Sequence, residues 1–184
     1  MITREESLAL VKEHVKNENL VNHMIAVGAI MKGLAERFGE DTALWEAVGI
    51  LHDIDYENFG EDFGKHGVIS AEMVKDLLPA EGIKAILSHN ELTGNKPETR
   101  FDISLLAADA ISGMIVANAL VRPTKLEGMK AKSIKGRMKD KSFARQVSRE
   151  NIMKCEEIGL DFSEFAQIAI NSMEKVASEI GLSA

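Results

Sequence analysis

Residues 101–121 constrain the fold most, because this stretch is apolar almost throughout. A helix that is apolar on every side is stable only where other elements surround it. Pro123 follows the stretch and ends the helix, since proline cannot continue a helical backbone. The sequence therefore predicts a buried helix over residues 101–121 at the centre of the molecule.

Apolar residues elsewhere follow helical spacing in nearly every segment. Thr3 and Glu6 fit a capping box at the start of a first helix. A second helix is predicted from about residue 20 to 38, ending at Gly39, and Asp41 caps a third. Further helices are predicted over 67–77 and 80–89, with loops at 56–64 and 91–100, and a C-terminal helix shares an apolar face of Phe165, Ile168, Ala169, Met173, Val176 and Ile180.

No β-type alternation extends over more than a few residues, and nothing repeats at a fixed period. The predicted fold class is therefore all-α. We expect a single compact domain over residues 1–184, in which a core at about 20–121 is followed by basic and amphipathic helices at 122–184.

The composition excludes several classes of protein. Apolar residues make up 45% of the chain and aromatic residues only 5%, so the core must be aliphatic. A net charge of −7 disfavours general nucleic-acid binding, because the average surface repels a polyanion. The single cysteine, Cys155, excludes an internal disulfide and is expected to be a packed small hydrophobe. We also expect no segment long enough to span a bilayer, no membrane partner and a cytoplasmic location.

Histidines and acids occur in an order that indicates a metal site. Asp109 lies inside the apolar run of the central helix, and Asp53 follows another apolar run. A buried carboxylate is costly without a partner, and a cation removes that cost. Four of the five histidines lie in the same part of the chain: His23, His52, His66 and His89. The alternative is a buried hydrogen-bonded network without metal.

The order His … His-Asp … Asp, with the doublet in "GILHDIDYE", resembles the HD superfamily of metal-dependent phosphohydrolases. The segments "GKHGVISAEMV" and "AILSHNELTG" resemble the members that hold two metals. The resemblance covers about residues 22–113 and implies an HD-domain helical bundle. It further implies that His23, His52, Asp53 and Asp109 bind one metal, while His66 and His89 bind a second and Asp53 bridges both. Many binuclear members read "HDIG", whereas this chain has Asp55 in place of the glycine.

The implied reaction is cleavage of a phosphoester, chiefly of a nucleotide or related small molecule, by a metal-activated water. The expected cofactor is one or two divalent ions of Mn, Fe, Co, Ni or Zn, with Mg as a further candidate, because imidazole and carboxylate suit these ions. Asp53 and Asp55 are the candidate catalytic residues. For Asp55 the alternative is a solvated loop acid, and the catalytic hypothesis is that it orients a water or acts as a general acid.

A basic tract offers candidate contacts for an anionic substrate. Residues 122–149 hold ten Lys and Arg against two acids, which gives a local charge of +8. Lys141, Arg145 and Arg149 are spaced at i, i+4 and i+8, so we expect them on one helical face that binds the substrate phosphate. The alternative is a solvated helix face.

Two other functions compete with hydrolysis. Some HD-fold proteins with a similar ligand order hold two irons and activate oxygen, and the ligand set does not separate the two chemistries. A non-catalytic nucleotide-binding sensor is the third hypothesis, but such a module has no need of a complete ligand set. The expected partner is a small phosphorylated molecule, and a homodimer is a candidate assembly.

Overall fold

The computed structural model describes residues 2–184, and all regular structure in that range is helical. The order of elements is α1 (Arg4–His14), α2 (Glu18–Phe38), α3 (Thr42–Leu51), η1 (Phe63–Lys65), α4 (Val68–Val74), α5 (Ala80–Ser88), η2 (Glu91–Thr93), α6 (Arg100–Leu120), α7 (Ala131–Lys139), α8 (Arg149–Met153), η3 (Lys154–Ile158) and α9 (Phe162–Lys175). The predicted all-α fold class is confirmed.

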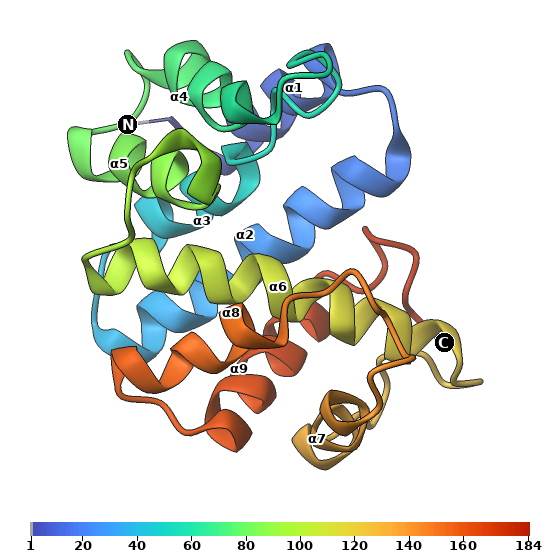
Figure 1. Ribbon diagram of the computed structural model, residues 1–184. Coiled ribbons are helices and arrows are strands. Elements are labelled where there is room, and N and C mark those ends of the chain that lie inside the picture. The colour runs from blue at the N-terminus through green and yellow to red at the C-terminus, as the bar shows by residue number, and fades with distance from the viewer. Residues whose placement is uncertain (1) are drawn as a thin grey trace.

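Helix α6 crosses the middle of the molecule (Figure 1). Helices α1, α3, α4 and α5 lie on one side of it and α7, α8 and α9 on the other, with α2 running behind both groups. Residues Leu105, Ile111, Met114 and Ile115 of α6 are completely buried among these neighbours. The predicted central buried helix is therefore confirmed.

Length and hydropathy would allow α6 to cross a membrane. Its mean hydropathy reaches 1.7 over an 18-residue window, although 67% of that window is buried inside the molecule. The expectation that no segment has bilayer-spanning length is therefore wrong. Packing against the surrounding helices accounts for the apolar character of α6, since a central core helix needs apolar residues on all sides.

Local signals fix several helix ends as predicted. Thr3 and Glu6 form the reciprocal capping box of α1. The Asp41 carboxylate accepts from the backbone amides of Ala43 and Leu44, which begins α3. Gly39 ends α2 in the left-handed conformation, with φ of 73°. These signals act within a few residues in the sequence, and they set the start of α1, the end of α2 and the start of α3.

The basic tract is less helical than predicted. Helix α7 ends at Lys139, and residues 141–146 form turns before α8 begins at Arg149. Ala144 has a φ of 45°, which interrupts any continuous helix through this segment. The prediction that Lys141, Arg145 and Arg149 share one helical face is therefore wrong.

Candidate metal centre

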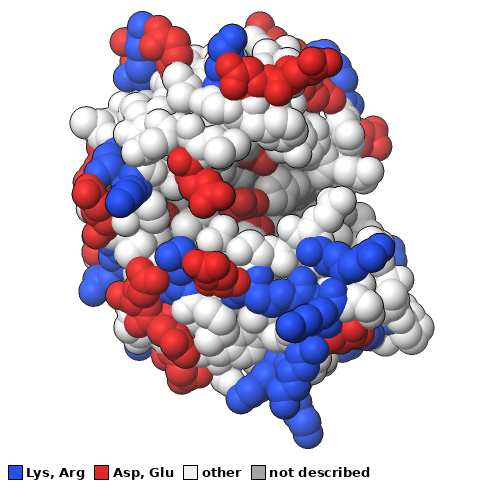
Figure 2. Space-filling view, in the orientation of Figure 1, with Lys and Arg blue, Asp and Glu red and all other residues white. Residues whose placement is uncertain are grey.

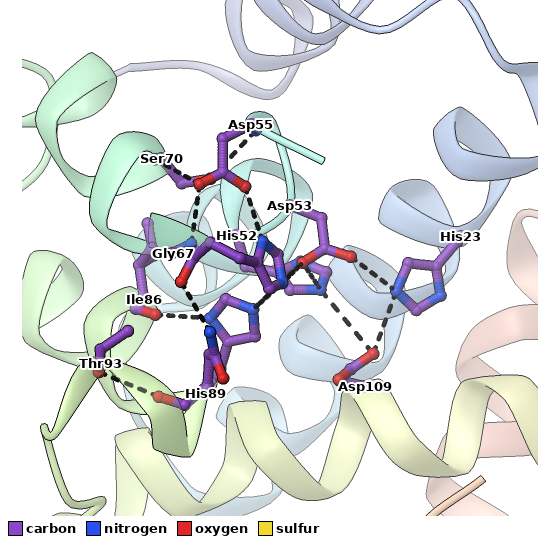
Figure 3. Close-up of polar contacts among 12 residues, drawn as sticks. His23, His52, Asp53, Asp55, Gly67, Ser70, Ile86, His89, Thr93 and Asp109 are labelled. Carbon is purple, nitrogen blue, oxygen red and sulfur yellow. Dashed lines mark hydrogen bonds and ion pairs between the residues drawn. The ribbon is translucent and has the colours of Figure 1, made fainter. Parts of the chain in front are cut away.

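Six predicted ligands from five parts of the chain meet in one cluster, and Figure 3 shows five of them, labelled, above α6. His23 comes from α2, and Asp109 comes from α6. The four others lie at or just beyond helix ends: His52, Asp53, His66 and His89. The structure therefore brings together every residue that the resemblance assigns to metal binding.

Two glycines bring α2 and α3 close enough to place His23 beside the His52–Asp53 doublet. A Cβ atom on Gly49 would lie 2.8 Å from the Cα atom of Gly28, so the two backbones are in contact. The rings of His23 and His52 consequently lie 5.4 Å apart between centroids. The His23 Nε2 atom lies 3.1 Å from Asp109 Oδ1 and 3.5 Å from Asp53 Oδ2.

Asp53 occupies the middle of the cluster. Its Oδ1 atom lies 3.3 Å from His52 Nε2, 3.3 Å from His66 Nε2 and 3.2 Å from His89 Nε2. Its Oδ2 atom faces His23. One carboxylate therefore contacts all four histidines, as a ligand shared by two ions would.

The ring orientation of each histidine is set by an acceptor at Nδ1. His52 donates to the Gly49 carbonyl and His89 to the Ile86 carbonyl, each three residues earlier. His66 donates to Asp55 Oδ1. The Ser112 hydroxyl donates to the Asp109 carbonyl and so accepts from His23. A neutral ring that donates through Nδ1 carries a lone pair at Nε2, so four Nε2 lone pairs point at carboxylates.

Lone pairs that face carboxylate oxygens are unfavourable unless a cation or protons lie between them. The buried atoms His52 Nε2 and Asp53 Oδ1 have no hydrogen-bond partner among residues 2–184. Donation of the second ring nitrogen to a carbonyl or carboxylate is also the usual support of a metal-bound histidine. The residues present therefore fit a divalent metal.

Without a metal, protons must balance the charge in this cluster. Burial lowers the pKa of His23, but the Asp109 and Asp53 carboxylates outweigh that effect and raise the pKa to about 10. Burial likewise opposes protonation of His66, whose pKa is nevertheless raised to about 9 by Asp53 and Asp55. Burial dominates at His52, whose pKa falls to about 4, so this ring stays neutral and free to ligate at pH 7. Strong electrostatic coupling of this kind is typical of functional sites.

Asp55 does not occupy a place from which it could act directly on a substrate. Its side chain is completely buried. One oxygen accepts from His66 Nδ1 at 2.8 Å, and the other accepts from the backbone amides of Gly67 and Ser70 at 2.7 and 3.0 Å. Burial raises the pKa of Asp55, but these donors outweigh it and lower the pKa, so the group stays ionised. The direct catalytic role predicted for Asp55, as general acid or water-orienting group, does not fit this placement.

A pocket of about 620 Å³ opens beside His66, His89 and Asp109. Figure 2 shows the hollow on this face, with acidic side chains inside it and basic side chains along one edge. The pocket walls come from the loop after α5, from α6 and from the segment that runs through α8 to the start of η3, and they include Lys96, Ser148, Asn151 and Lys154. Sequence reasoning missed these four residues because the pocket exists only where α8 packs against α6.

The three predicted phosphate contacts lie outside the lining of that pocket. The Arg149 guanidinium donates to the backbone carbonyls of Ala144, Val147, Asp140 and Phe143, so it holds the turn before α8 together. Lys141 and Arg145 are exposed side chains in that turn. The geometry therefore offers Lys96 and Lys154, in place of the predicted trio, as the lysines that line the pocket beside the centre.

An all-helical bundle with a cluster of four histidines and two aspartates defines the class: an all-α protein with a candidate divalent-metal centre. The chain belongs to the HD domain family, whose family model matches residues 20–114, just over half of its length. This membership supports metal-dependent phosphohydrolase chemistry as the broad class of activity.

Ribonuclease Y from several bacteria is similar to this chain. The protein from Thermoanaerobacter pseudethanolicus is 31% identical over 172 residues, which cover 89% of this chain and 33% of the relative. The protein from Latilactobacillus sakei is 37% identical over 142 residues, or 72% of this chain and 26% of the relative. The protein from Lawsonia intracellularis is 36% identical over 97 residues, which cover 52% of this chain and 18% of the relative. The chain thus spans a third or less of these relatives, and no solved structure matches it significantly.

Proposed function

We propose that this protein is a metal-dependent hydrolase of small phosphoesters, with nucleotides as the leading substrate class. One observation carries the proposal: four histidine Nε2 atoms and two carboxylates converge beside a pocket of about 620 Å³ that is lined in part by His66, His89 and Asp109. A pocket of this size suits a ligand of nucleotide dimensions.

The distances within the cluster support a division of the ligands between two ions. His23, His52 and Asp109 would hold one ion, His66 and His89 would hold the other, and Asp53 would serve both. When bound, the ions would supply a water of lowered pKa and neutralise charge on the phosphoryl oxygens. The imidazole and carboxylate groups of the cluster favour Mn, Fe, Co, Ni or Zn, with Mg less suited to so many imidazoles.

The pocket walls would bind and orient the substrate. Lys96 and Lys154 offer positive charge to the phosphoryl group, and Ser148 and Asn151 offer hydrogen bonds. Glu91 and Glu150 line the same pocket and would repel additional phosphates. This balance favours a substrate with one phosphoryl group over a long polyanion.

The relatives support a nucleotide. Their name, ribonuclease Y, describes enzymes that cleave RNA, whose scissile group is a phosphoester between nucleotides. Because this chain spans a third or less of those proteins, we propose hydrolysis of a small nucleotide ester as its own activity.

The test is a hydrolysis panel on metal-stripped protein, resupplied in turn with Mn²⁺, Fe²⁺, Co²⁺ and Mg²⁺, with substrates and products separated by chromatography. The panel holds nucleoside monophosphates, cyclic nucleotides, a short RNA and a sugar phosphate. We expect metal-dependent turnover of a nucleotide, abolished in Asp53→Asn. Turnover of the sugar phosphate alone would contradict the substrate class, and oxygen uptake with bound iron would replace hydrolysis with the oxygenase chemistry.

A further inference from the structure

The Asp55 carboxylate joins a helix start to one metal-site histidine. Helix α4 begins after Gly67, whose position offers no capping side chain. Asp55 supplies the cap from outside the helix, because one of its oxygens accepts from the amides of Gly67 and Ser70. Its other oxygen accepts from His66 Nδ1 at 2.8 Å. The Ser70 hydroxyl in turn accepts from the Asp55 amide at 3.2 Å, which fixes the Asp55 backbone to α4.

His66 needs this external acceptor, whereas His52 and His89 do not. The latter two have helical backbone and donate through Nδ1 to a carbonyl of their own helical turn. His66 has extended backbone, with φ of −61° and ψ of 128°, and its Nδ1 atom pairs with the Asp55 carboxylate in place of a carbonyl of its own turn. Asp55 is therefore the hydrogen-bond acceptor for Nδ1 of His66, whereas backbone carbonyls are the acceptors for His52 and His89.

Asp55 determines which ring nitrogen of His66 faces the cluster. With Nδ1 donating to Asp55, Nε2 points to Asp53 Oδ1 at 3.3 Å and lies 3.1 Å from His89 Nε2. An asparagine at position 55 cannot keep all three contacts, because its amide nitrogen must face either His66 or the two backbone amides. Facing His66, that nitrogen would donate to Nδ1, put the proton on Nε2 and remove the lone pair that binds metal.

We propose that Asp55 is the positioning residue of the second metal site, so that the ion held by His66 and His89 depends on it and the other ion does not. This inference rests on the proposed function, in that it requires the cluster to bind two ions. No contact joins Asp55 to His23, His52 or Asp109 among the polar contacts of residues 2–184. Weakening of second-site affinity by 10- to 100-fold is the usual result of losing such a support, so we expect a loss of about that size.

A purely structural role for Asp55 would be to cap α4, and a matched control separates the two roles. Asp102 is also a buried carboxylate, 1% exposed, that accepts from the backbone amides of Glu98 and Thr99 at a helix start. It contacts no histidine of the cluster among the described residues. Asp102→Asn should therefore lower stability as Asp55→Asn does, without changing metal binding.

The experiment is a Mn²⁺ titration by calorimetry of the wild type, Asp55→Asn and Asp102→Asn, with electron paramagnetic resonance of the loaded proteins. We expect two ions and an exchange-coupled pair signal in the wild type and in Asp102→Asn. In Asp55→Asn we expect one ion of unchanged affinity, a second bound about 10- to 100-fold more weakly, and an isolated-ion signal at low loading. If Asp55→Asn does not fold, Asp55→Ser carries the same expectation.

Two results would overturn the inference while leaving the proposed function intact. One is a pair of ions in Asp55→Asn with wild-type affinities and a coupled signal. The other is an equal loss of both ions, which would make Asp55 a general structural support. Absence of bound metal from the wild type would instead overturn the proposed function, and the inference with it.

Discussion

Gly49 of α3 lies directly against Gly28 of α2, so that a Cβ atom on Gly49 would come within 2.8 Å of the Gly28 Cα atom and 2.9 Å of its nitrogen. Backbone atoms cannot move aside as a flexible side chain does. The close approach also carries His23 of α2 to the His52–Asp53 doublet that follows α3. A glycine contact therefore sets the distance between ligands on two different helices.

Gly49→Ala should force α2 and α3 apart and lower the free energy of unfolding by about 1–3 kcal/mol. Denaturant unfolding followed by circular dichroism measures this change. Gly136→Ala is the matched control, because Gly136 lies in α7 and nothing occupies the space within 4 Å of its Cβ position. The control should be neutral or stabilising by about 0.5–1 kcal/mol, since alanine favours helix. Equal stability of both variants would refute the close-contact account.

The two ions should be lost separately. His66→Ala should leave the ion held by His23, His52 and Asp109 and remove the other ion. The reason is that the Nε2 atom of His66 lies against His89 and the shared Asp53. Asp109→Ala should remove the first ion and abolish activity, because Asp109 Oδ1 faces His23 and His52. Elemental analysis after Mn²⁺ loading gives the count for each variant. Unchanged metal content in Asp109→Ala would exclude its ligand role.

Lys154 and Lys96 should contribute to substrate affinity more than Lys141 does. The first two line the pocket beside the centre, whereas Lys141 lies in an exposed turn outside that lining. Lys154→Ala should raise KM for a phosphoester by about tenfold and weaken its dependence on salt, because a charge-assisted contact is lost. Lys141→Ala is the control of equal charge. A larger KM effect from Lys141→Ala would restore the basic tract as the substrate site.

Cys155 should be inert in the folded protein. Its side chain is completely buried, and burial, together with Glu156 and Asp161, raises the thiol pKa to about 11. At pH 8 the thiol is therefore almost entirely protonated. An aromatic disulfide reagent should label Cys155 only after guanidinium unfolding, and labelling is measured by absorbance. Rapid labelling of the native protein would show that this part of the core opens.

Sequence signals of short range predicted the helices well. Thr3 with Glu6, Asp41 and Gly39 act on backbone groups within a few residues, so their effect is visible in the sequence alone. The ligand set was predicted from the resemblance of the His … His-Asp … Asp order to the HD superfamily, and the apolar settings of Asp53 and Asp109 supported it, because a buried carboxylate requires a compensating charge. The structure places those six residues together, although their metal-binding role stays a prediction.

Features that depend on tertiary contacts were not predictable from the sequence. The position of Asp55 is defined by hydrogen-bond donors 11 to 15 residues away along the chain. The sequence alone therefore suggests an ordinary solvated acid in a loop. The pocket beside the centre needs the packing of α8 near α6, which no local pattern encodes. Regular spacing of Lys141, Arg145 and Arg149 suggested a helix, but Ala144 interrupts the segment and Arg149 binds backbone carbonyls.

The most direct test of the central claim is the metal content of the wild-type protein. The purified chain would be stripped with a chelator, dialysed against Mn²⁺, freed of loose ions and analysed by mass spectrometry of the elements. The convergence of four Nε2 atoms on Asp53 and Asp109 predicts about two ions per chain, and none in Asp53→Asn. A wild-type protein that retains no metal would contradict the account and show that protons alone balance this cluster.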